Sequence, residues 1–464
     1  MKTTAVLILA LFPVLLGVGP AVAAPKGADQ LGEELAALTD AINAQLKLLA
    51  LYEDMGKADD VAATKKTLLD LLDKQREAGA RLRELLGGKP AAEPSDEPFV
   101  GGRTSRIPPP DAKPLPPAGS VRDVIDRGLA WLAAHQHADG HWDCDGWMKP
   151  AGLGAGAGAG HAPFDAGVTG LALLAFLGDG QTHKNGNHKA TVKAGLRYLK
   201  QLQDPEGCFG LRTSQRFVYH HAICTLAMIE AYALTESPVF KRSAQLATDF
   251  IHKAQNPYLA WRYGVRPQDN DTSVTGWMVL ALHAAKRANL RVSPEAFAGA
   301  MAWIDKATEP EYGRVGYTAR GTGPARPQDV MDRYPADKSE SLTAVGLVTR
   351  VHCGHGKGEL YEKGIALCLK RLPLWDEDAG TTDMYYWFWG TMALRQSGGA
   401  AWKAWRPAMA AALTANQRQA GPLAGSFDPI GPWGRNGGRI YSTAILTLTA
   451  EMASSAAAVK GAGK

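Results

Sequence analysis

Gln136-His137-Ala138-Asp139-Gly140-His141-Trp142 is the stretch from which the fold can be read. A glutamine ends a helical segment, Asp-Gly makes a tight turn, and a tryptophan follows. The pattern returns in weakened form at 203–209, as Gln-x-x-Glu-Gly-x-Phe. At 255–261 only the terminal Gln and Trp remain, and at 425–427 only Gly-Ser-Phe. The stretch and its echoes indicate an internal repeat.

The repeating unit is about 50 residues long, a length at which repeats form stacked or closed architectures. Each unit contains a half-polar helix, a loop rich in glycine and aromatic residues, and a more apolar helix. The half-polar helices are expected at 121–136, 191–203, 240–255, 294–307, 361–372 and 402–417. The apolar helices are expected to begin near Asp165, Tyr219, Asp271, Ser339, Asp383 and Gly438. Because neither end carries a polar capping repeat, these six hairpins predict a closed, all-α, double-layered ring, an α/α toroid, with the apolar helices inside.

The chain begins with the pattern of a secretory signal peptide. Lys2 is followed by an apolar run from Ala5 to Val18 and by small residues at 21–23. We therefore expect residues 1–23 to be removed by cleavage after Ala23, which makes the protein exported, either periplasmic or extracellular. No cysteine directly follows the apolar run, so a lipid anchor is not expected. No later apolar run is expected to span a bilayer.

A helical hairpin is expected at 24–89, ahead of the ring. Apolar residues recur every three or four positions over 31–49 and over 61–85, on either side of a polar turn. Such a hairpin buries little apolar surface by itself, so we expect self-association through residues 30–88 or docking on another surface. Nine prolines at 90–118 predict an extended linker. The ring then occupies 119–455, and 456–464 is expected to be a flexible tail.

Charge and cysteine content exclude several classes of protein. The formal net charge is +5, with acidic residues spread along the chain, which does not favour binding to nucleic acid or to an anionic membrane. Five cysteines are too few for a disulfide scaffold in an exported chain of 464 residues, and their pairing is left open. The fold must therefore rest on its hydrophobic core.

The heptad at 136–142 resembles the QW repeat of squalene cyclases and of protein prenyltransferase β-subunits, which share an α/α toroid. The resemblance covers roughly 120–452 and implies the same ring. The chain also resembles secreted bacterial prenyltransferase and squalene oxidase repeat proteins, through the stretches at 271–277, 385–391 and 437–443. The resemblance implies architecture and does not imply one activity.

Residues that the resemblance would make catalytic are replaced or incomplete. The zinc ligands of the prenyltransferases correspond to Ser339, in place of a thiolate, and Tyr386, in place of an imidazole. The Asp-x-Asp-Asp acid of the cyclases has its closest match at 376–379, which lacks the last Asp. If the protein is an enzyme, we expect Asp376, Asp378 or Asp383 to supply the acid, because clustered carboxylates raise one another's pKa. A solvated loop explains the same residues.

The starts of the apolar helices are the candidate binding surface. There, Asp and Ser cap a helix in any protein, but in a ring the same residues surround the mouth of the central cavity. The expected ligand-binding residues are Asp165, His220, His221, Asp271, Trp277, Glu340, Tyr386, Arg439 and Tyr441. Trp375 and the aromatic run at 385–389 fit either a cavity wall or a packed core.

No metal site and no cofactor are predicted. His135, His137, His141, Asp143, Cys144, Asp145 and His161 gather near the first repeat, but their spacing matches no tight zinc pattern. Three hypotheses remain for the ring. It binds an apolar, isoprenoid or polypeptide ligand in its cavity, with or without catalysis; it converts isoprenoids with an Asp acid; or it acts on carbohydrate with carboxylates beside exposed Trp. The fold alone does not choose among them.

Overall fold

The computed structural model describes residues 117–454 except 211 and 213–215, together with Leu115 and scattered residues between Gly27 and Arg81. By its contacts the chain divides into two units, Met1–Arg103 and Thr104–Lys464, and each is described by itself. The expected signal peptide and C-terminal tail lie outside the described residues, as does most of the expected linker.

The first unit contains two helical segments. Described residues from Gln30 to Leu48 and from Asp59 to Arg81 are helical. Arg81, near the end of the second segment, pairs with Glu34, near the start of the first, with 3.2 Å between Nη2 and Oε1. Contact between the start of one helix and the end of the next is the pairing found in an antiparallel helical hairpin.

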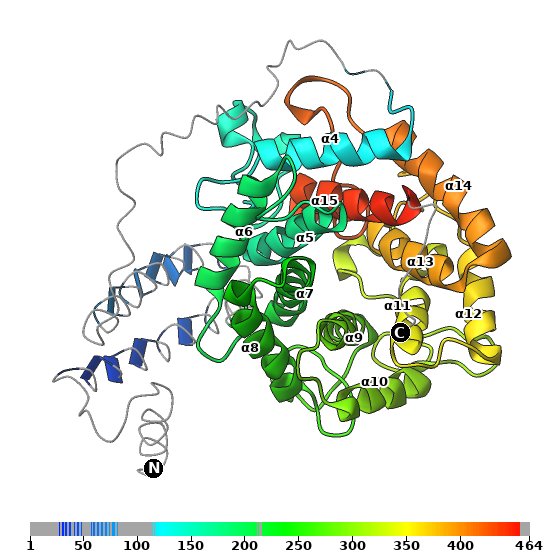
Figure 1. The fold of residues 1–464 in the computed structure, drawn as a ribbon, viewed down its shortest axis with the longest axis horizontal. Coiled ribbons are helices and arrows are strands. Elements are labelled where there is room, and N and C mark those ends of the chain that lie inside the picture. The colour runs from blue at the N-terminus through cyan, green and yellow to red at the C-terminus, as the bar shows by residue number, and fades with distance from the viewer. Residues whose placement is uncertain are drawn as a thin grey trace. The chain divides into compact units, whose positions relative to one another are not determined.

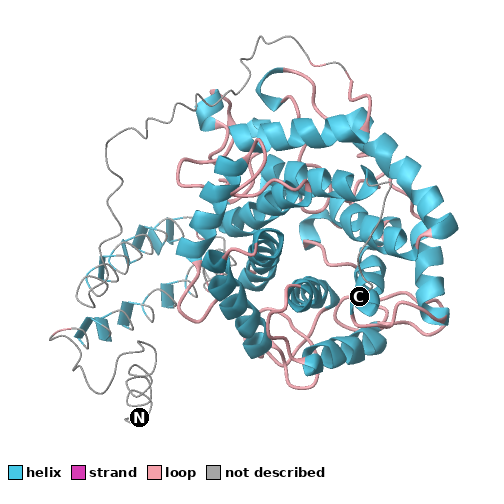
Figure 2. Ribbon diagram, viewed as in Figure 1, coloured by secondary structure: helices cyan, strands magenta, loops and turns pink. Residues whose placement is uncertain are grey.

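Twelve α-helices of the second unit alternate between two layers within the described residues (Figure 1). The outer layer contains α4 (Val121–Ala134), α6 (Lys189–Leu202), α8 (Pro238–Ala254), α10 (Pro294–Ala307), α12 (Glu359–Leu369) and α14 (Gly399–Asn416). The inner layer contains α5 (Asp165–Gly178), α7 (Phe217–Thr235), α9 (Thr272–Arg287), α11 (Ser341–His352), α13 (Met384–Ser397) and α15 (Gly434–Ser454). Short 3₁₀ turns occur in the connecting loops, and the described part contains no strand (Figure 2).

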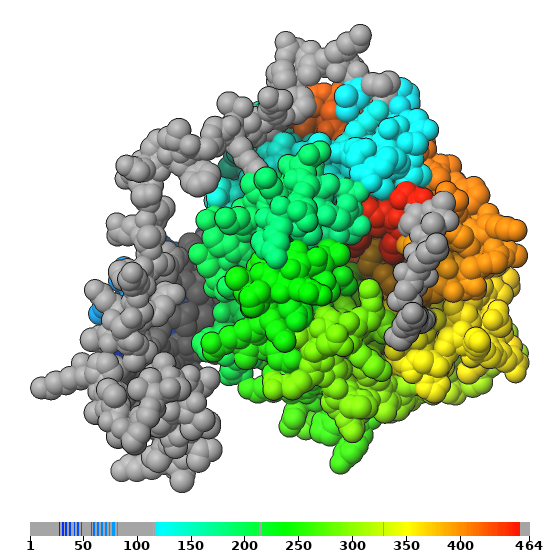
Figure 3. Space-filling model, in the orientation of Figure 1, coloured from blue at the N-terminus to red at the C-terminus, as the bar shows by residue number. Residues whose placement is uncertain are grey.

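The inner helices close into a ring. Each packs on the next in chain order, from α5 through α7, α9, α11 and α13 to α15, and α15 packs back on α5. In the outer layer α14 contacts α4, and the space-filling view shows the C-terminal α15 beside the first outer helix (Figure 3). The expected six-hairpin α/α toroid is therefore confirmed.

Burial on all sides explains why the inner helices are apolar all round. α7, for example, is buried at nearly every position from Phe217 to Ala231, because it touches α5, α9 and α8. By length and composition alone, Ala155–Gly178 and Phe217–Thr235 could cross a membrane, contrary to the expectation that no later apolar run would do so. Both are mostly buried inside the ring, as core helices are.

The repeated glutamines join neighbouring hairpins. Gln136 donates from Nε2 to the carbonyl of Gly140 in its own turn, at 2.8 Å, and to that of Thr191 in the first turn of α6, at 3.0 Å. Gln203, Gln255 and Gln417 make the same two kinds of bond, to Gly207 and Ser243, to Leu259 and Ala296, and to Gly425 and Val124. We call each of these hydrogen-bonded joints between neighbouring hairpins a seam. Because Val124 belongs to α4, the last seam links the sixth hairpin to the first.

Trp142 ties the two layers together at the first seam. Its indole N–H donates to the carbonyl of Leu132 on α4, and its backbone N–H donates to Oγ1 of Thr169 on α5. The turn before it needs glycine, since Gly140 has φ of +109° and a Cβ there would lie 2.3 Å from the carbonyl oxygen of Ala194. The heptad is thus a structural joint.

All five cysteines are free thiols, and four of them are buried. The ring is held by its core and its seams.

Candidate ligand cavity

A cavity opens at the end of the ring where the inner helices begin. It holds about 1040 Å³ of empty space, counted out to its open mouth. First turns of α5, α7, α9, α13 and α15 line it, with residues from the loops that precede the inner helices. Its walls are mainly apolar and aromatic, including Trp277, Trp433 and five tyrosines, Tyr219, Tyr263, Tyr317, Tyr385 and Tyr441.

The tyrosines bring hydroxyl groups to an otherwise apolar wall. Those of Tyr263 and Tyr317 bond to each other, and that of Tyr385 bonds to Oγ of Ser273 at 2.6 Å. The Tyr441 hydroxyl is buried and has no hydrogen-bond partner. Burial raises the pKa of Tyr385 and of Tyr441 above the usual range. These phenols therefore stay protonated and can donate.

Three arginines reach the cavity from the connecting loops. The Arg326 guanidinium is paired with Asp383, with 2.9 Å from Nη2 to Oδ2, and both side chains are at most 5% exposed. Arg262 pairs with Asp269 at 2.5 Å. Its Nε lies 3.8 Å from Oδ2 of the buried Asp271. The Arg216 guanidinium lies over the ring of Phe164.

His220 supplies an imidazole to the same wall. Its ring is 5.8 Å from that of Phe164, edge to face, and its Nε2 is buried without a hydrogen-bond partner. Burial lowers the pKa of His220 to about 4, so the ring is neutral at physiological pH. A side chain in place of Gly167 would put a Cβ 2.8 Å from the imidazole, so the glycine makes room for it.

Asp271 stands just behind the wall. It caps α9, with Oδ1 accepting the backbone N–H of Val274 at 2.7 Å, and its side chain is fully buried. Burial raises the pKa of Asp271 to about 7, against the opposing effects of the Val274 N–H and of Arg262. The carboxyl is therefore partly protonated near neutral pH.

Several buried polar atoms at this cavity lack a hydrogen bond. The buried atoms without a hydrogen bond include Nε2 of His220, Oη of Tyr441, Nε of Arg262 and Nε of Arg326, all on lining residues, and Oδ2 of Asp271. Buried polar groups in native proteins are nearly always hydrogen-bonded, and an unmet one costs about 1–3 kcal/mol. A concentration of them beside one cavity is typical of a site that a polar ligand atom or water completes.

Three of the expected ligand-binding residues line the cavity, namely His220, Trp277 and Tyr441. Two others do not line the cavity: Asp271, as described, and Asp165 in the first turn of α5, which accepts the backbone N–H of Cys144 at 2.8 Å. Burial raises the pKa of Asp165 to about 6.

The remaining four are placed away from the cavity by contacts of their own. His221 accepts the backbone N–H of Phe209 at Nδ1. It therefore takes the part that Oγ1 of Thr169 plays at the first seam, where it accepts the backbone N–H of Trp142. Tyr386 points to the outer layer, where its hydroxyl donates to the carbonyl of Cys368.

Glu340 and Arg439 are held by ion pairs in the loops. Glu340 pairs with Arg314, and Arg439 pairs with Asp428 at 2.6 Å while donating from Nε to the carbonyl of Ala157. Neither side chain lines the cavity.

The expected catalytic carboxylates are not brought together. Asp376 and Asp378 lie in a loop outside the cavity, where Asp376 accepts the backbone N–H of Ala379 and Asp378 is exposed. Asp383 caps α13 by accepting the N–H of Tyr386, and its other oxygen serves Arg326 and Ser339. Its carboxylate is occupied by structural partners and does not line the cavity.

Arg216, Arg262 and Arg326, with the loop tyrosines Tyr263 and Tyr317, were not expected from the sequence. They lie in irregular connections, where no period assigns a direction to a side chain. The only available signal was a weak one, the presence of Arg or Tyr close before several inner helices.

Comparison with known proteins matches no family and finds several distant structural likenesses. No family model and no curated protein matches the chain. An inactive variant of the α-1,6-mannanase GH76A from Salegentibacter, in complex with α-1,6-mannotriose, is 12% identical over 72% of this chain and 99% of its own, with a TM-score of 0.48.

Two other solved structures are similarly distant. The type II terpene cyclase MstE from Scytonema is 13% identical, covering 71% of this chain and 97% of its own, with a TM-score of 0.45. The Lin0763 protein of Listeria innocua is 13% identical, covering 72% and 97%, with a TM-score of 0.46. At these identities the likenesses say nothing about the activity of this chain.

Proposed function

We propose that the ring binds, in its central cavity, an apolar ligand such as an isoprenoid or a polypeptide segment, anchored by at least one polar group. The observation that carries the proposal is the set of buried polar atoms without a hydrogen bond on His220, Tyr441, Arg262 and Arg326 in an aromatic wall. Aromatic faces provide apolar contact, and a few convergent polar groups orient a ligand. The binding requires no chemical step.

Replacing Tyr441 by Phe tests the proposal. Its hydroxyl is buried and unbonded in the free protein, so Tyr441→Phe should leave the stability unchanged or higher. Binding of geranylgeraniol, followed through tryptophan fluorescence and checked by native mass spectrometry, should weaken about tenfold, the effect of losing one good hydrogen bond.

Tyr386→Phe is the matched control, because the Tyr386 hydroxyl bonds to the Cys368 carbonyl outside the cavity. It should lower the stability and leave geranylgeraniol binding unchanged. Binding of neither geranylgeraniol nor an apolar peptide would contradict the proposal, as would equal binding by Tyr441→Phe and the unaltered protein. Binding of mannotriose alone would favour the carbohydrate hypothesis.

A second candidate function is conversion of an isoprenoid by an acid, and Asp271 favours it more than the acids expected from the sequence. It is the buried carboxyl beside the cavity whose pKa is raised to about 7. A protonated Asp271 would give its proton to an alkene carbon, leaving a carbocation against the aromatic wall and a carboxylate beside Arg262.

Asp271 does not itself line the cavity, so this function also requires a lining side chain to move and expose it. Asp271→Asn should abolish turnover of geranylgeraniol while leaving its binding intact, and Asp376→Asn should leave both intact. Turnover that survives Asp271→Asn would rule out this acid. The carbohydrate hypothesis is less favoured, since no carboxylate is among the residues that line the cavity.

We also propose that the protein is exported and that its N-terminal hairpin mediates self-association. Support comes from the signal-peptide pattern before Ala23 and from the apolar periodicity of the hairpin. N-terminal sequencing of the protein from its own cell envelope should begin at Ala24. Light scattering should report a larger species for the full mature chain than for one cut in the linker.

A further inference from the structure

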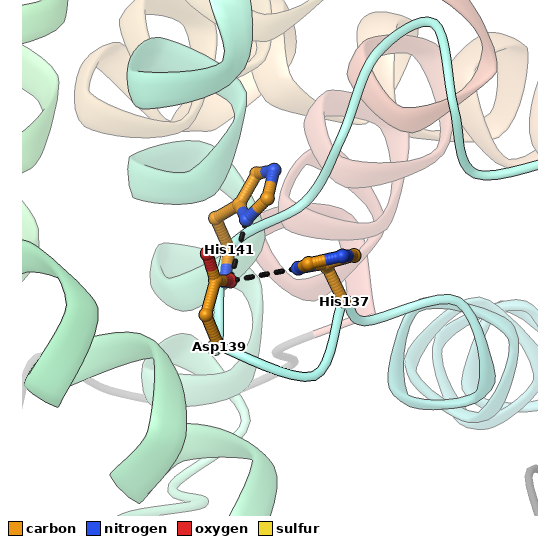
Figure 4. Close-up of side chains that lie close together, drawn as sticks. All are labelled: His137, Asp139 and His141. Atoms are coloured by element: carbon orange, nitrogen blue, oxygen red, sulfur yellow. Dashed lines mark hydrogen bonds and ion pairs between the residues drawn. The ribbon is translucent and has the colours of Figure 1, made fainter. Parts of the chain in front are cut away.

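The turn of the first seam places three metal-ligating side chains together on the surface. His137, Asp139 and His141 alternate along the turn and converge in space (Figure 4). Oδ1 of Asp139 lies 3.0 Å from Nδ1 of His137 and 2.6 Å from Nδ1 of His141. One ligand atom from each residue falls within 4.8 Å of the other two.

The backbone holds this arrangement in place. The N–H of His137 donates to the carbonyl of His141 at 2.9 Å, and the N–H of Gly140 donates to the carbonyl of His137 at 3.0 Å. The Gln136 side chain fastens the turn to α6, and the His141 ring stacks on Tyr198 of that helix at 5.1 Å. The turn is therefore rigid before any ligand arrives, which lowers the entropic cost of binding.

We propose that His137, Asp139 and His141 bind a divalent first-row transition metal ion of the zinc class. A site with two imidazoles and a carboxylate binds such ions in preference to Mg²⁺ or Ca²⁺. Bonds of about 2.0–2.1 Å place ligand atoms about 3.3 Å apart in a tetrahedral site, so the present separations require shifts of less than about 1.5 Å. The side chains of His137 and Asp139 are 54% and 50% exposed, which leaves the remaining coordination positions to water.

The second seam shows what distinguishes the first. Its turn carries Asp204, Glu206 and Cys208 at the corresponding positions. There the carboxylates are neutralised by Arg212 and Lys253, and Asp204 also accepts the backbone N–H of Cys208. No lysine or arginine pairs with Asp139 among the described residues. The first seam thus retains a carboxylate whose partners are the two imidazoles.

Calorimetric titration of the full mature chain with Zn²⁺, after removal of metal by a chelator, tests the proposal. One equivalent should bind, and Co²⁺ in its place should give the intense visible absorption of a four-coordinate or five-coordinate site. Asp139→Asn and His137→Ala should each weaken binding at least about tenfold. His161→Ala, which removes an exposed histidine elsewhere, and Glu206→Gln at the second seam should bind as the unaltered protein does.

Circular dichroism of the metal-free variants separates lost binding from lost folding, and both altered side chains are half exposed. A dissociation constant of about 100 μM corresponds to a binding free energy of only about −5 to −6 kcal/mol. The absence of any heat of binding at zinc concentrations up to about 100 μM would overturn the proposal. So would equal binding by Asp139→Asn, or several weak equivalents that persist in all variants. None of these results depends on the central cavity.

Discussion

Asp271 and Asp383 occupy the same place in two hairpins and have opposite surroundings. Each is the N-cap of an inner helix, and each accepts a backbone N–H three residues on through Oδ1. The second oxygen differs. Oδ2 of Asp383 receives Arg326 at 2.9 Å and Ser339 at 2.8 Å, whereas Oδ2 of Asp271 has no hydrogen bond and lies 3.8 Å from Arg262.

The difference separates a carboxylate held by two hydrogen bonds on its second oxygen from one whose second oxygen has none. Capping needs only one oxygen, so the other can complete a buried ion pair or remain available. Arg326 and Ser339 hold Asp383, at the start of α13, against the loop before α11. Without them, Asp271 keeps its proton more strongly, and burial raises its pKa to about 7. The same residue at the same repeat position therefore has two electrostatic environments.

The largest effect is expected from Asp383→Asn. This change keeps the shape and the cap but leaves the Arg326 guanidinium, with a side chain 2% exposed, without its counter-charge. Breaking a buried pair from one side costs about 3–5 kcal/mol, to be measured by urea unfolding at pH 7. A second substitution, Arg326→Met, should recover much of the loss; a double variant as unstable as the sum would contradict the pairing.

Asp271→Asn should instead change how stability depends on pH. The folded pKa is about 7 and the ordinary pKa of an aspartate is 3.8, so between these values the folded state holds a proton that the unfolded state has lost. The contribution of Asp271 to the free energy of unfolding is therefore most favourable below about pH 4. It falls as the pH rises to about 7 and is constant above that.

Three pKa units correspond to at most about 4 kcal/mol. The Asn variant lacks this loss, so its stability relative to the unaltered protein should increase from pH 4 to pH 7, as measured by urea unfolding at several pH values. Parallel profiles for the two proteins would mean that Asp271 is ionised when folded.

Ser339→Ala should have a smaller effect, confined to the Asp383 side of the comparison. The hydroxyl donates to Oδ2 of Asp383, and a hydrogen bond to a charged group contributes about 1.5–3 kcal/mol. Because Arg326 remains, we expect the lower end of this range in urea unfolding. A loss as large as that of Asp383→Asn would show that the serine, and not the arginine, holds the carboxylate.

Asp376→Asn is expected to have the smallest effect. Its Oδ1 accepts the N–H of Ala379 in an external loop, and the Asn side chain keeps an acceptor. The free energy of unfolding should change by less than about 0.5 kcal/mol. A change comparable to that of Asp383→Asn would show that the loop has a structural role that its exposure does not suggest.

The ring architecture could be predicted because it depends on periodic signals. The alternation of half-polar and apolar helices located all twelve elements, and α10 was expected with the bounds it has. Glutamine at the end of four outer helices marked the seams, where its amide serves two carbonyls each time. Such patterns are local, because they follow from burial on one helix face and from hydrogen-bonding needs at a turn.

The cavity could be predicted only in part. His220, Trp277 and Tyr441 were expected because they lie near the starts of inner helices. Tyr386 is next to Tyr385 in the same helix, yet it faces the outer layer, where Trp405 packs against it. A one-residue step turns a side chain by about 100°, so an aromatic run cannot reveal which members face the axis.

By itself the sequence determined the fold class, the number of hairpins and the joints between them, because each rests on local periodicity and short-range hydrogen bonding. Only the tertiary structure decided which capping aspartate has a hydrogen-bonded ion pair and which has only a long one. That difference depends on Arg326, which meets Asp383 from 57 residues away, and on Arg262, which approaches Asp271 without bonding to its Oδ2. Long-range placement of loop side chains thus sets the chemistry of the cavity, because electrostatic energies in a buried site depend on distances that no local pattern encodes.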